Sequence, residues 1–250
     1  MSPVLIAFGI IFICIGSVLL HVSLDTPEFS LDYTHCVAHQ DHLNRSCAEI
    51  LSWQHGGTCE CIVEITLEQH FPRDVFFYYG LENFHQNHRM FVRSRDDGQL
   101  RGNIDKDPSP YCDPYRYTEH NNQTRPVAPC GLIANAIFND SFSLHQLPSR
   151  RLVPLVGGGS VWAHERELKF RNPPDVDLRE ALEAHNISRP PSWSRELWEL
   201  DPANPENNGF QNEDLINWMR SAALPSFQRT DKLPDTRYGA RNSPLQVLRA

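Results

Sequence analysis

The sequence predicts a mainly β fold with short helices, in which a disulfide-bridged ectodomain is carried on an N-terminal transmembrane helix. Three observations support this fold class. Residues 4–20 contain no charged side chain. Six cysteines outside that run are accompanied by four N-glycosylation sequons. The stretches 61–68 and 75–81 have the apolar patterns of strands, bounded by turn residues.

The apolar run near the N-terminus, VLIAFGIIFICIGSVLL, predicts a membrane-spanning helix over residues 3–23. The first charged residue is Asp25, and at about 1.5 Å per residue the preceding stretch can cross a hydrocarbon core of about 30 Å. A cleaved signal peptide is the alternative, but no basic segment precedes the run and no small-x-small cleavage site follows it. We favour a retained signal anchor, with residues 24–227 as the lumenal or extracellular ectodomain and residues 228–250 as a divergent, flexible tail.

The cysteines and sequons indicate that the ectodomain lies in the secretory lumen or outside the cell. One cysteine, Cys14, lies in the apolar run, and an even number remains for disulfides. These six are Cys36, Cys47, Cys59, Cys61, Cys112 and Cys130. The four sequons, at which we expect glycans, are at Asn44, Asn122, Asn139 and Asn186. Zinc binding by the first four cysteines is the alternative, but the one-residue gap in Cys59-x-Cys61 is shorter than the usual ligand spacing.

Two stretches are predicted to be strands. In residues 61–68 apolar and polar side chains alternate, which indicates a half-exposed strand. In residues 75–81 aromatic and β-branched side chains occupy both faces, which indicates a central strand covered on both sides. A turn containing Pro72 connects the two stretches, so we expect them to pair antiparallel.

Helices are predicted where the apolar period changes to three and four. These stretches are residues 83–92, a compact element ending at Ala136, and residues 213–224. The last of them has Asn212 as its cap and Pro225 after its end, with a buried stripe of Leu215, Trp218, Met219 and Ala222. Residues 160–170 are predicted as a further strand, and residues 103–129 as a loop bracketed by Cys112 and Cys130.

Two clusters could bind a ligand. Arg89, Arg93 and Arg95 follow the aromatic strand and could hold a phosphate or a lipid headgroup. Because Asp96 and Asp97 follow them, we favour local charge neutralisation in a structural turn. His85 and His88 could ligate a metal, but further ligands are not evident nearby, so we favour solvated or core histidines.

Several function classes are disfavoured. The net charge of -8 carries no basic patch for nucleic acid. The glycines at 157–159 lack the Gly-Lys-Ser/Thr ending of a phosphate-binding loop, and the calcium-loop-like stretch 204–215 has Leu215 where a bidentate glutamate is required. The sequence contains no Asp-Lys-Thr-Gly phosphorylation loop, no nucleophile elbow and no His-Glu-x-x-His motif. We therefore expect no enzyme, no cofactor and no metal site.

Four blocks of this sequence carry a family resemblance. They are VFFYYGLENFHQNHRMFVRSRDDGQLRG, APCGLIANAIFNDSFSL, KFRNPP and NNGFQNEDLINWMRSAALPSF. In this order they closely resemble the accessory (β) subunits of type-four P-type ATPases, the phospholipid flippases, in the cell-cycle-control and ligand-effect-modulator family. The resemblance runs from the membrane segment to about Phe227.

The resemblance implies a glycosylated, antiparallel β-sandwich-like ectodomain that clasps the exoplasmic face of the ATPase catalytic subunit in a heterodimer. The subunit is not catalytic and acts on phospholipid only through the ATPase. It assists folding of the ATPase, exit from the endoplasmic reticulum and the transport cycle, which places it in the endoplasmic reticulum, Golgi and plasma membrane. The resemblance also implies nested bridges, Cys36 with Cys61 and Cys47 with Cys59, and a third joining Cys112 with Cys130.

The family has a second transmembrane helix near its C-terminus, and this sequence has no second long apolar run. We therefore expect a chain that lacks the C-terminal part of the family, whose tail adds no strands to the sheet, and whose support of an ATPase is impaired. Two rival functions are a single-pass cell-surface glycoprotein that binds an extracellular ligand independently, and an enzyme of the secretory lumen. The sequence does not name the ATPase or its lipid.

Overall fold

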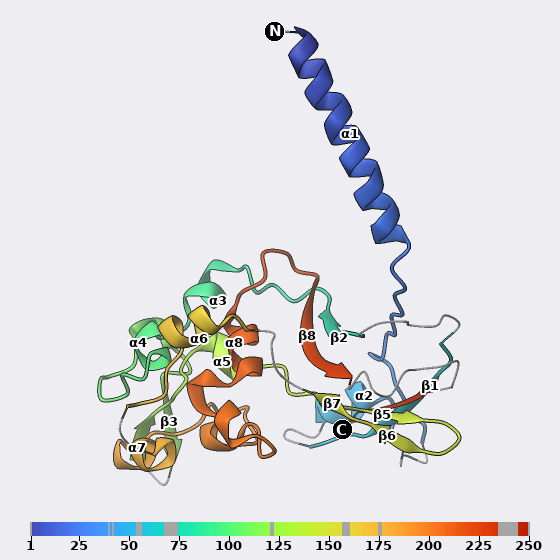
Figure 1. The fold of residues 1–250 in the computed structure, drawn as a ribbon. Helices are drawn as coiled ribbons and strands as arrows, with labels where there is room; N and C mark the ends of the chain where they lie inside the picture. Colours follow the sequence, from blue (N-terminus) through green and yellow to red (C-terminus); the bar gives the residue numbers. More distant parts are fainter. Residues whose placement is uncertain are drawn as a thin grey trace.

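The computed structural model describes residues 2–39, 41, 43–53, 57–67, 75–120, 123–156, 161–174, 177–234 and 245–249. Helix α1 (Ser2–Leu24) projects from a folded body (Figure 1). Its stretch Pro3–Leu24 is apolar, exposed along its length and long enough to cross a membrane. The predicted N-terminal apolar helix is therefore confirmed.

A four-stranded antiparallel sheet has the order β1-β9-β5-β6. Its strands are β1 (Cys61–Ile65), β9 (Leu245–Arg249), β5 (Phe142–Gln146) and β6 (Arg151–Val153). β1 confirms a strand within the stretch 61–68, of which residue 68 lies outside the described residues. The expected pairing of this strand with the aromatic strand is wrong, because β1 pairs with β9 and the aromatic strand belongs to another sheet.

The aromatic strand β2 (Phe77–Leu81) forms a three-stranded sheet with β8 (Phe227–Pro234) and β7 (Leu155–Val156), in the order β2-β8-β7. Two parts of the prediction for this strand are wrong. In this sheet β2 lies at an edge, and Tyr78 is 49% exposed, so the strand is not covered on both faces. Alternation puts Tyr79 on the inner face, where it stacks on Phe138 with 3.8 Å between ring centroids.

The expectation that residues 228–250 add no strands is wrong. β8 lies between β2 and β7, and β9 lies between β1 and β5. The sequence of β8 is poor in apolar residues, and that of β9 is only five residues long. Backbone pairing with neighbouring strands, which the local pattern does not reveal, defines both strands.

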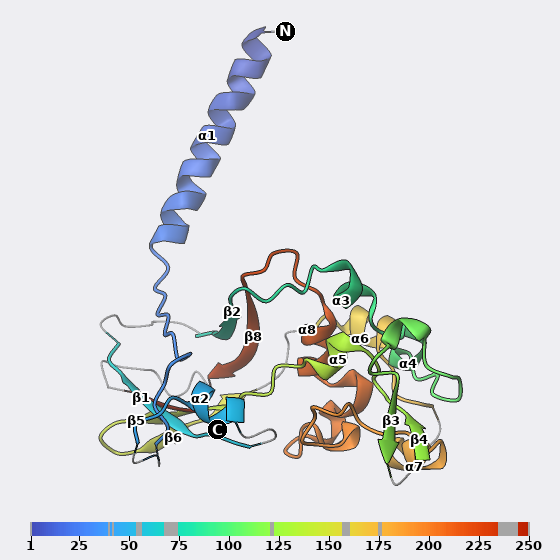
Figure 2. The same cartoon turned by 180° about the vertical axis from the view of Figure 1, so that it is seen from behind.

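The body has a sheet end and a helical end. Figures 1 and 2 both place β1, β5 and β6 at one end, and α7 (Leu178–Ala184) beside β3 (Tyr117–His120) at the other. In the part of the chain that the structure describes, the remaining strand is β4 (Gln123–Pro126), which pairs with β3. Short helices and small antiparallel sheets are confirmed, but the body is mixed rather than mainly β, and its sandwich-like stacking stays a prediction.

Residues 163–169 correct the prediction of a strand over 160–170. They form helix α6 (Ala163–Lys169), while residue 160 lies outside the described residues. The sequence AHERELK is rich in good helix formers. Lys169 Nζ lies 3.2 Å from Glu165 Oε1, one helical turn away, which adds an ion pair along the helix surface.

The predicted helix over 83–92 is shorter than expected. Helix α3 (Arg89–Arg93) begins only after a turn. Asn83 has a positive φ of 56°, and the Phe84 N–H donates to the Pro225 carbonyl at 3.0 Å. Because these features fix the backbone in a non-helical path, Phe84 lies outside the helix, and Leu81 is the last residue of β2.

Helix α8 (Glu213–Met219) forms the centre of the main core. Its cap is confirmed, since Asn212 Oδ1 accepts from the Leu215 N–H at 2.9 Å. Leu215, Trp218 and Met219 are buried as predicted. The helix ends five residues earlier than expected, so Ala222 lies after it and is only half-buried.

Helix α5 (Leu132–Asn135), within the predicted element ending at Ala136, packs beside α8. Two tryptophans donate hydrogen bonds to its backbone. Trp218 Nε1 donates to the Ile133 carbonyl and Trp193 Nε1 to the Ala134 carbonyl, each at 2.7 Å. Carbonyls in the last turn of a helix lack intrahelical partners, so the Trp218 indole satisfies the Ile133 carbonyl. The Ala134 carbonyl accepts from both the Trp193 indole and the Ile137 N–H, the latter at 3.3 Å.

Candidate interaction site

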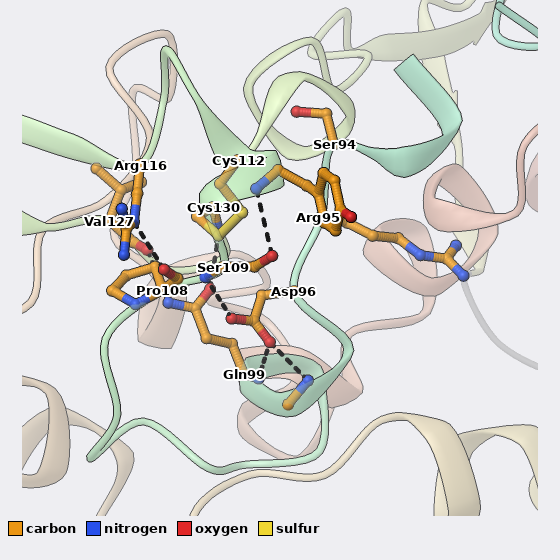
Figure 3. Close-up of a disulfide and its surroundings, with 12 residues drawn as sticks. Ser94, Arg95, Asp96, Gln99, Pro108, Ser109, Cys112, Arg116, Val127 and Cys130 are labelled. Carbon is orange, nitrogen blue, oxygen red and sulfur yellow. Dashed lines mark hydrogen bonds between the residues drawn. A yellow bond between two sulfur atoms is a disulfide. The ribbon is translucent and has the colours of Figure 1, made fainter. Parts of the chain in front are cut away.

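The Cys112–Cys130 disulfide joins the predicted loop to the start of α5. Cys112 ends the single turn η1 (Pro110–Cys112), and both cysteines are buried. The side chain of Gln99 lies beneath the bridge (Figure 3). Gln99 Nε2 donates to the Val127 carbonyl and Gln99 Oε1 accepts from the Cys130 N–H, each at 3.0 Å. One buried amide therefore fixes the backbone on the C-terminal side of the bridge.

Asp96 fixes the other side of the bridge. Its Oδ1 accepts from the Gly98 and Gln99 N–H groups at 2.7 and 3.2 Å, which caps helix α4 (Asp97–Leu100). Its Oδ2 accepts from the Ser109 N–H at 2.8 Å (Figure 3). The carboxylate of Asp96 is thus used to cap a helix and to hold the start of η1.

An open hollow of ≈ 500 Å³ lies beside these two anchors. Within it the guanidinium of Arg93 lies 4.3 Å from the centroid of the Tyr111 ring. Arg95 Nε pairs with Asp97 Oδ1 at 3.0 Å. The hollow is lined by Val92, Arg93, Arg95, Asp96, Asp97, Gly98, Ser109 and Tyr111.

This geometry tests the prediction for the three arginines. Neutralisation of Arg95 by Asp97 is confirmed, whereas Asp96 accepts from backbone groups instead. Arg93 and Arg95 share the hollow, and Arg89 does not line it. The mixed lining could accommodate a small polar or charged group. The described residues that line the hollow show no nucleophile paired with a base.

The predicted histidine pair is exposed, which confirms the solvated alternative for His85 and His88. Among the described residues, one cysteine group has the geometry for a metal: the sulfurs of Cys36, Cys47 and Cys61 lie within 4.8 Å of one another. In the structure these sulfurs belong to two disulfides, Cys36–Cys61 and Cys47–Cys59. Disulfide sulfurs carry no thiolate to ligate zinc. These are the nested pairs that the resemblance implies.

Three sequon asparagines lie on the surface. Asn44, Asn139 and Asn186 are exposed, and Asn44 and Asn186 each have a positive φ of 53°, typical of turns. Asn122 and the glycines at 157–159 lie outside the described residues. Two asparagines of the calcium-loop-like stretch 204–215 have structural roles. Asn207 Nδ2 donates to Asp201 Oδ2 at 2.8 Å, and Asn212 caps α8.

Two buried glutamines carry structural roles that the sequence does not reveal. Gln99 supports the Cys112–Cys130 bridge. Gln86 is completely buried, and its Oε1 accepts from the Ala222 N–H at 2.8 Å and from Arg229 at 3.0 Å. Burial lowers the pKa of the Arg229 guanidinium. A glutamine in a polar stretch is usually exposed, so no pattern marks either position.

A family model described as the LEM3 (ligand-effect modulator 3) family, or CDC50 family, matches residues 8–238. The chain belongs to the CDC50 family. The match confirms the resemblance found in the four sequence blocks, and it includes the disulfides, the hollow and β8.

Curated relatives extend across animals and plants. Cell cycle control protein 50A of Mus musculus is 41% identical over 242 residues, which are 94% of this chain and 64% of that protein. Cell cycle control protein 50B of Homo sapiens is 38% identical, over 91% of this chain and 65% of that protein. ALA-interacting subunit 3 of Arabidopsis thaliana is 33% identical, over 96% and 60%. This chain spans less than two thirds of each of these CDC50-family relatives.

Proposed function

We propose that this CDC50-family chain is the non-catalytic accessory subunit of a type-four P-type ATPase that moves phospholipid across a membrane. The family match over residues 8–238 carries the proposal. The name of the plant relative, ALA-interacting subunit 3, describes a subunit that interacts with another protein, and none of the three relatives' names is that of an enzyme. The chain would bind the ATPase as a heterodimer and assist its folding, its exit from the endoplasmic reticulum and its transport cycle.

In this proposal α1 spans the membrane and the body lies in the lumen or outside the cell, along the route from endoplasmic reticulum through Golgi to plasma membrane. The three disulfides support an oxidising compartment. The exposed sequon asparagines support the same side, because the glycosylation machinery acts only there. The interlocked polar contacts around Cys112–Cys130 provide a rigid surface for a partner.

The test is capture of a partner from detergent-solubilised membranes. The tagged full chain is expressed with a flippase catalytic subunit, and the captured proteins are identified by mass spectrometry. The expected result is capture of the ATPase by the native chain and equally by Cys14→Ser, which changes an exposed, unbridged cysteine on α1. Cys112→Ser/Cys130→Ser should capture less, because the bridged loops lose their fixed geometry.

The native chain could instead reach the cell surface without any ATPase and bind a soluble extracellular ligand. That result would contradict this proposal and favour an independent cell-surface glycoprotein. Surface delivery of the same ATPase, measured beside a relative such as cell cycle control protein 50A, gives a second readout. Delivery no higher than in cells without either subunit would contradict assistance by this chain.

A further inference from the structure

Residues 221–226, which form most of the connection between α8 and β8, are called the 221–226 loop. This loop lies on the edge of the body nearest α1. Figures 1 and 2 are related by a rotation about the vertical axis, and in both the loop is at the level of the C-terminal end of α1. Helix α3 lies on the same edge in both views. If α1 spans the membrane as proposed above, this edge faces the exoplasmic surface of that membrane.

The backbone of the 221–226 loop is held by three hydrogen bonds from a distant segment. The Ala222 N–H donates to Gln86 Oε1 at 2.8 Å, and Asn87 Nδ2 donates to the Ala223 carbonyl at 2.9 Å. The Phe84 N–H donates to the Pro225 carbonyl at 3.0 Å. Because Gln86 is completely buried, the anchor itself has a fixed position. The loop is therefore rigid in the conformation that the structure shows.

The tip of this rigid loop is apolar and points outward. Leu224 is 68% exposed, although its neighbours on both sides are fixed through their backbones. Residues 221–228, SAALPSFQ, contain no charged side chain. On α3, Met90 is also exposed, and basic Arg89 and Arg93 flank it. Exposed apolar side chains suit the interfacial region of a bilayer, where cationic side chains also meet lipid phosphate groups.

We infer that the 221–226 loop inserts Leu224 into the interfacial region of the exoplasmic lipid leaflet, and that this contact and α1 together set the orientation of the body on the membrane. One exposed leucine and one exposed methionine would not hold a free protein on a bilayer. Here α1 already attaches the chain, so the second contact is intramolecular and has a high effective concentration. The inference rests on the membrane anchor in the proposed function.

The experiment places one fluorescent label on the full chain in vesicles, without an ATPase. The six bridged cysteines stay oxidised, so Cys14 is the free cysteine available for an environment-sensitive NBD label in the native chain. Two further proteins carry Cys14→Ser with either Leu224→Cys or Leu152→Cys. Leu152 is the matched control, a leucine that is 53% exposed on β6, at the edge of the body away from α1 (Figure 1). Phosphatidylcholine vesicles without bromine, with bromine near the headgroup end of the acyl chains, or with bromine near their methyl end report lipid contact by quenching. The methyl-end bromines reach the bilayer centre, where residue 14 lies if α1 spans the membrane, and the headgroup-end bromines reach the interface.

The expected result is loss of emission in brominated vesicles for labels at 14 and 224, with little loss at 152. Quenching at 14 but not at 224 overturns the inference and leaves the membrane anchor standing. Absence of quenching at 14 contradicts the anchor, and the inference falls with it. Equal quenching at 224 and 152 overturns the specific contact, since the body then lies on lipid without a preferred side. If the label at 224 is instead shielded from water only after a flippase catalytic subunit is added, that result identifies a protein contact and also overturns the inference.

Discussion

Replacing Trp218 with phenylalanine should destabilise the body mainly through the loss of one hydrogen bond. The indole of Trp218 is buried and donates to the Ile133 carbonyl at 2.7 Å. Phenylalanine keeps most of the packing but leaves that carbonyl without its donor, at a cost of about 1–3 kcal/mol. For a chain of this length the change should lower Tm by about 2–12 °C, at about 2–4 °C per kcal/mol. Trp218→Ala, which also leaves a cavity, should cost about 3–5 kcal/mol.

The assay is thermal unfolding of the full chain in detergent micelles under non-reducing conditions, followed by circular dichroism. Trp53→Phe is the matched control, because Trp53 is 85% exposed and the same substitution there should change stability by no more than about 0.5 kcal/mol. Trp193→Phe should cost less than Trp218→Phe, since the Ala134 carbonyl that accepts from Trp193 also accepts from the Ile137 N–H at 3.3 Å. If Trp218→Phe has the same Tm as Trp53→Phe, the role assigned to the Trp218 indole at α5 is wrong.

Cys112→Ser/Cys130→Ser should lower the free energy of unfolding by about 3 kcal/mol, because the bridge spans 18 residues, while Cys14→Ser should leave it unchanged; denaturant titration checks both. Burial acts to raise the pKa of Glu165, but hydrogen bonds from Arg220 and from the last lysine of α6 outweigh it, so the pKa lies below its ordinary value. The stabilisation from this carboxylate is therefore present above about pH 4.5 and lost as pH falls through the lowered pKa. The difference in free energy of unfolding between native and Glu165→Gln chains should shrink in acid, and a difference that does not change with pH would contradict this. Glycosidase should increase the electrophoretic mobility of the membrane-expressed chain, and unchanged mobility would contradict a lumenal body; the sites are Asn44, Asn122, Asn139 and Asn186.

Features fixed by local sequence were predictable, and features fixed by distant contacts were not. The cap of α8 at Asn212 and the apolar helix α1 depend on neighbouring residues, and both were predicted. The partner of β1 is β9, far along the chain, so the local turn at Pro72 suggested a wrong hairpin. Residues 160–170 alternate enough to suggest a strand, but the good helix formers of AHERELK make residues 163–169 the helix α6.

The candidate site shows the same division. The proximity of Arg95 and Asp97 follows from their spacing and was predicted. The stacking of Arg93 on Tyr111 joins segments on either side of a turn-rich loop, and no periodic pattern indicates it. The cystine pairs came from family resemblance, since six cysteines alone allow fifteen pairings.

The long-range bonds of Gln86 impose an order on biosynthesis. Gln86 and its partner Ala222 are separated by 136 residues, so at about 5–20 residues per second ribosomes need roughly 7–27 s to make the chain between them. By contrast, Cys47 and Cys59 are separated by 12 residues and can meet early. While the chain between Gln86 and Ala222 is being made, the turn around Gln86 lacks the segment that covers it. Nascent chains should therefore depend on lumenal chaperones after the first bridge has closed and before the central core can assemble.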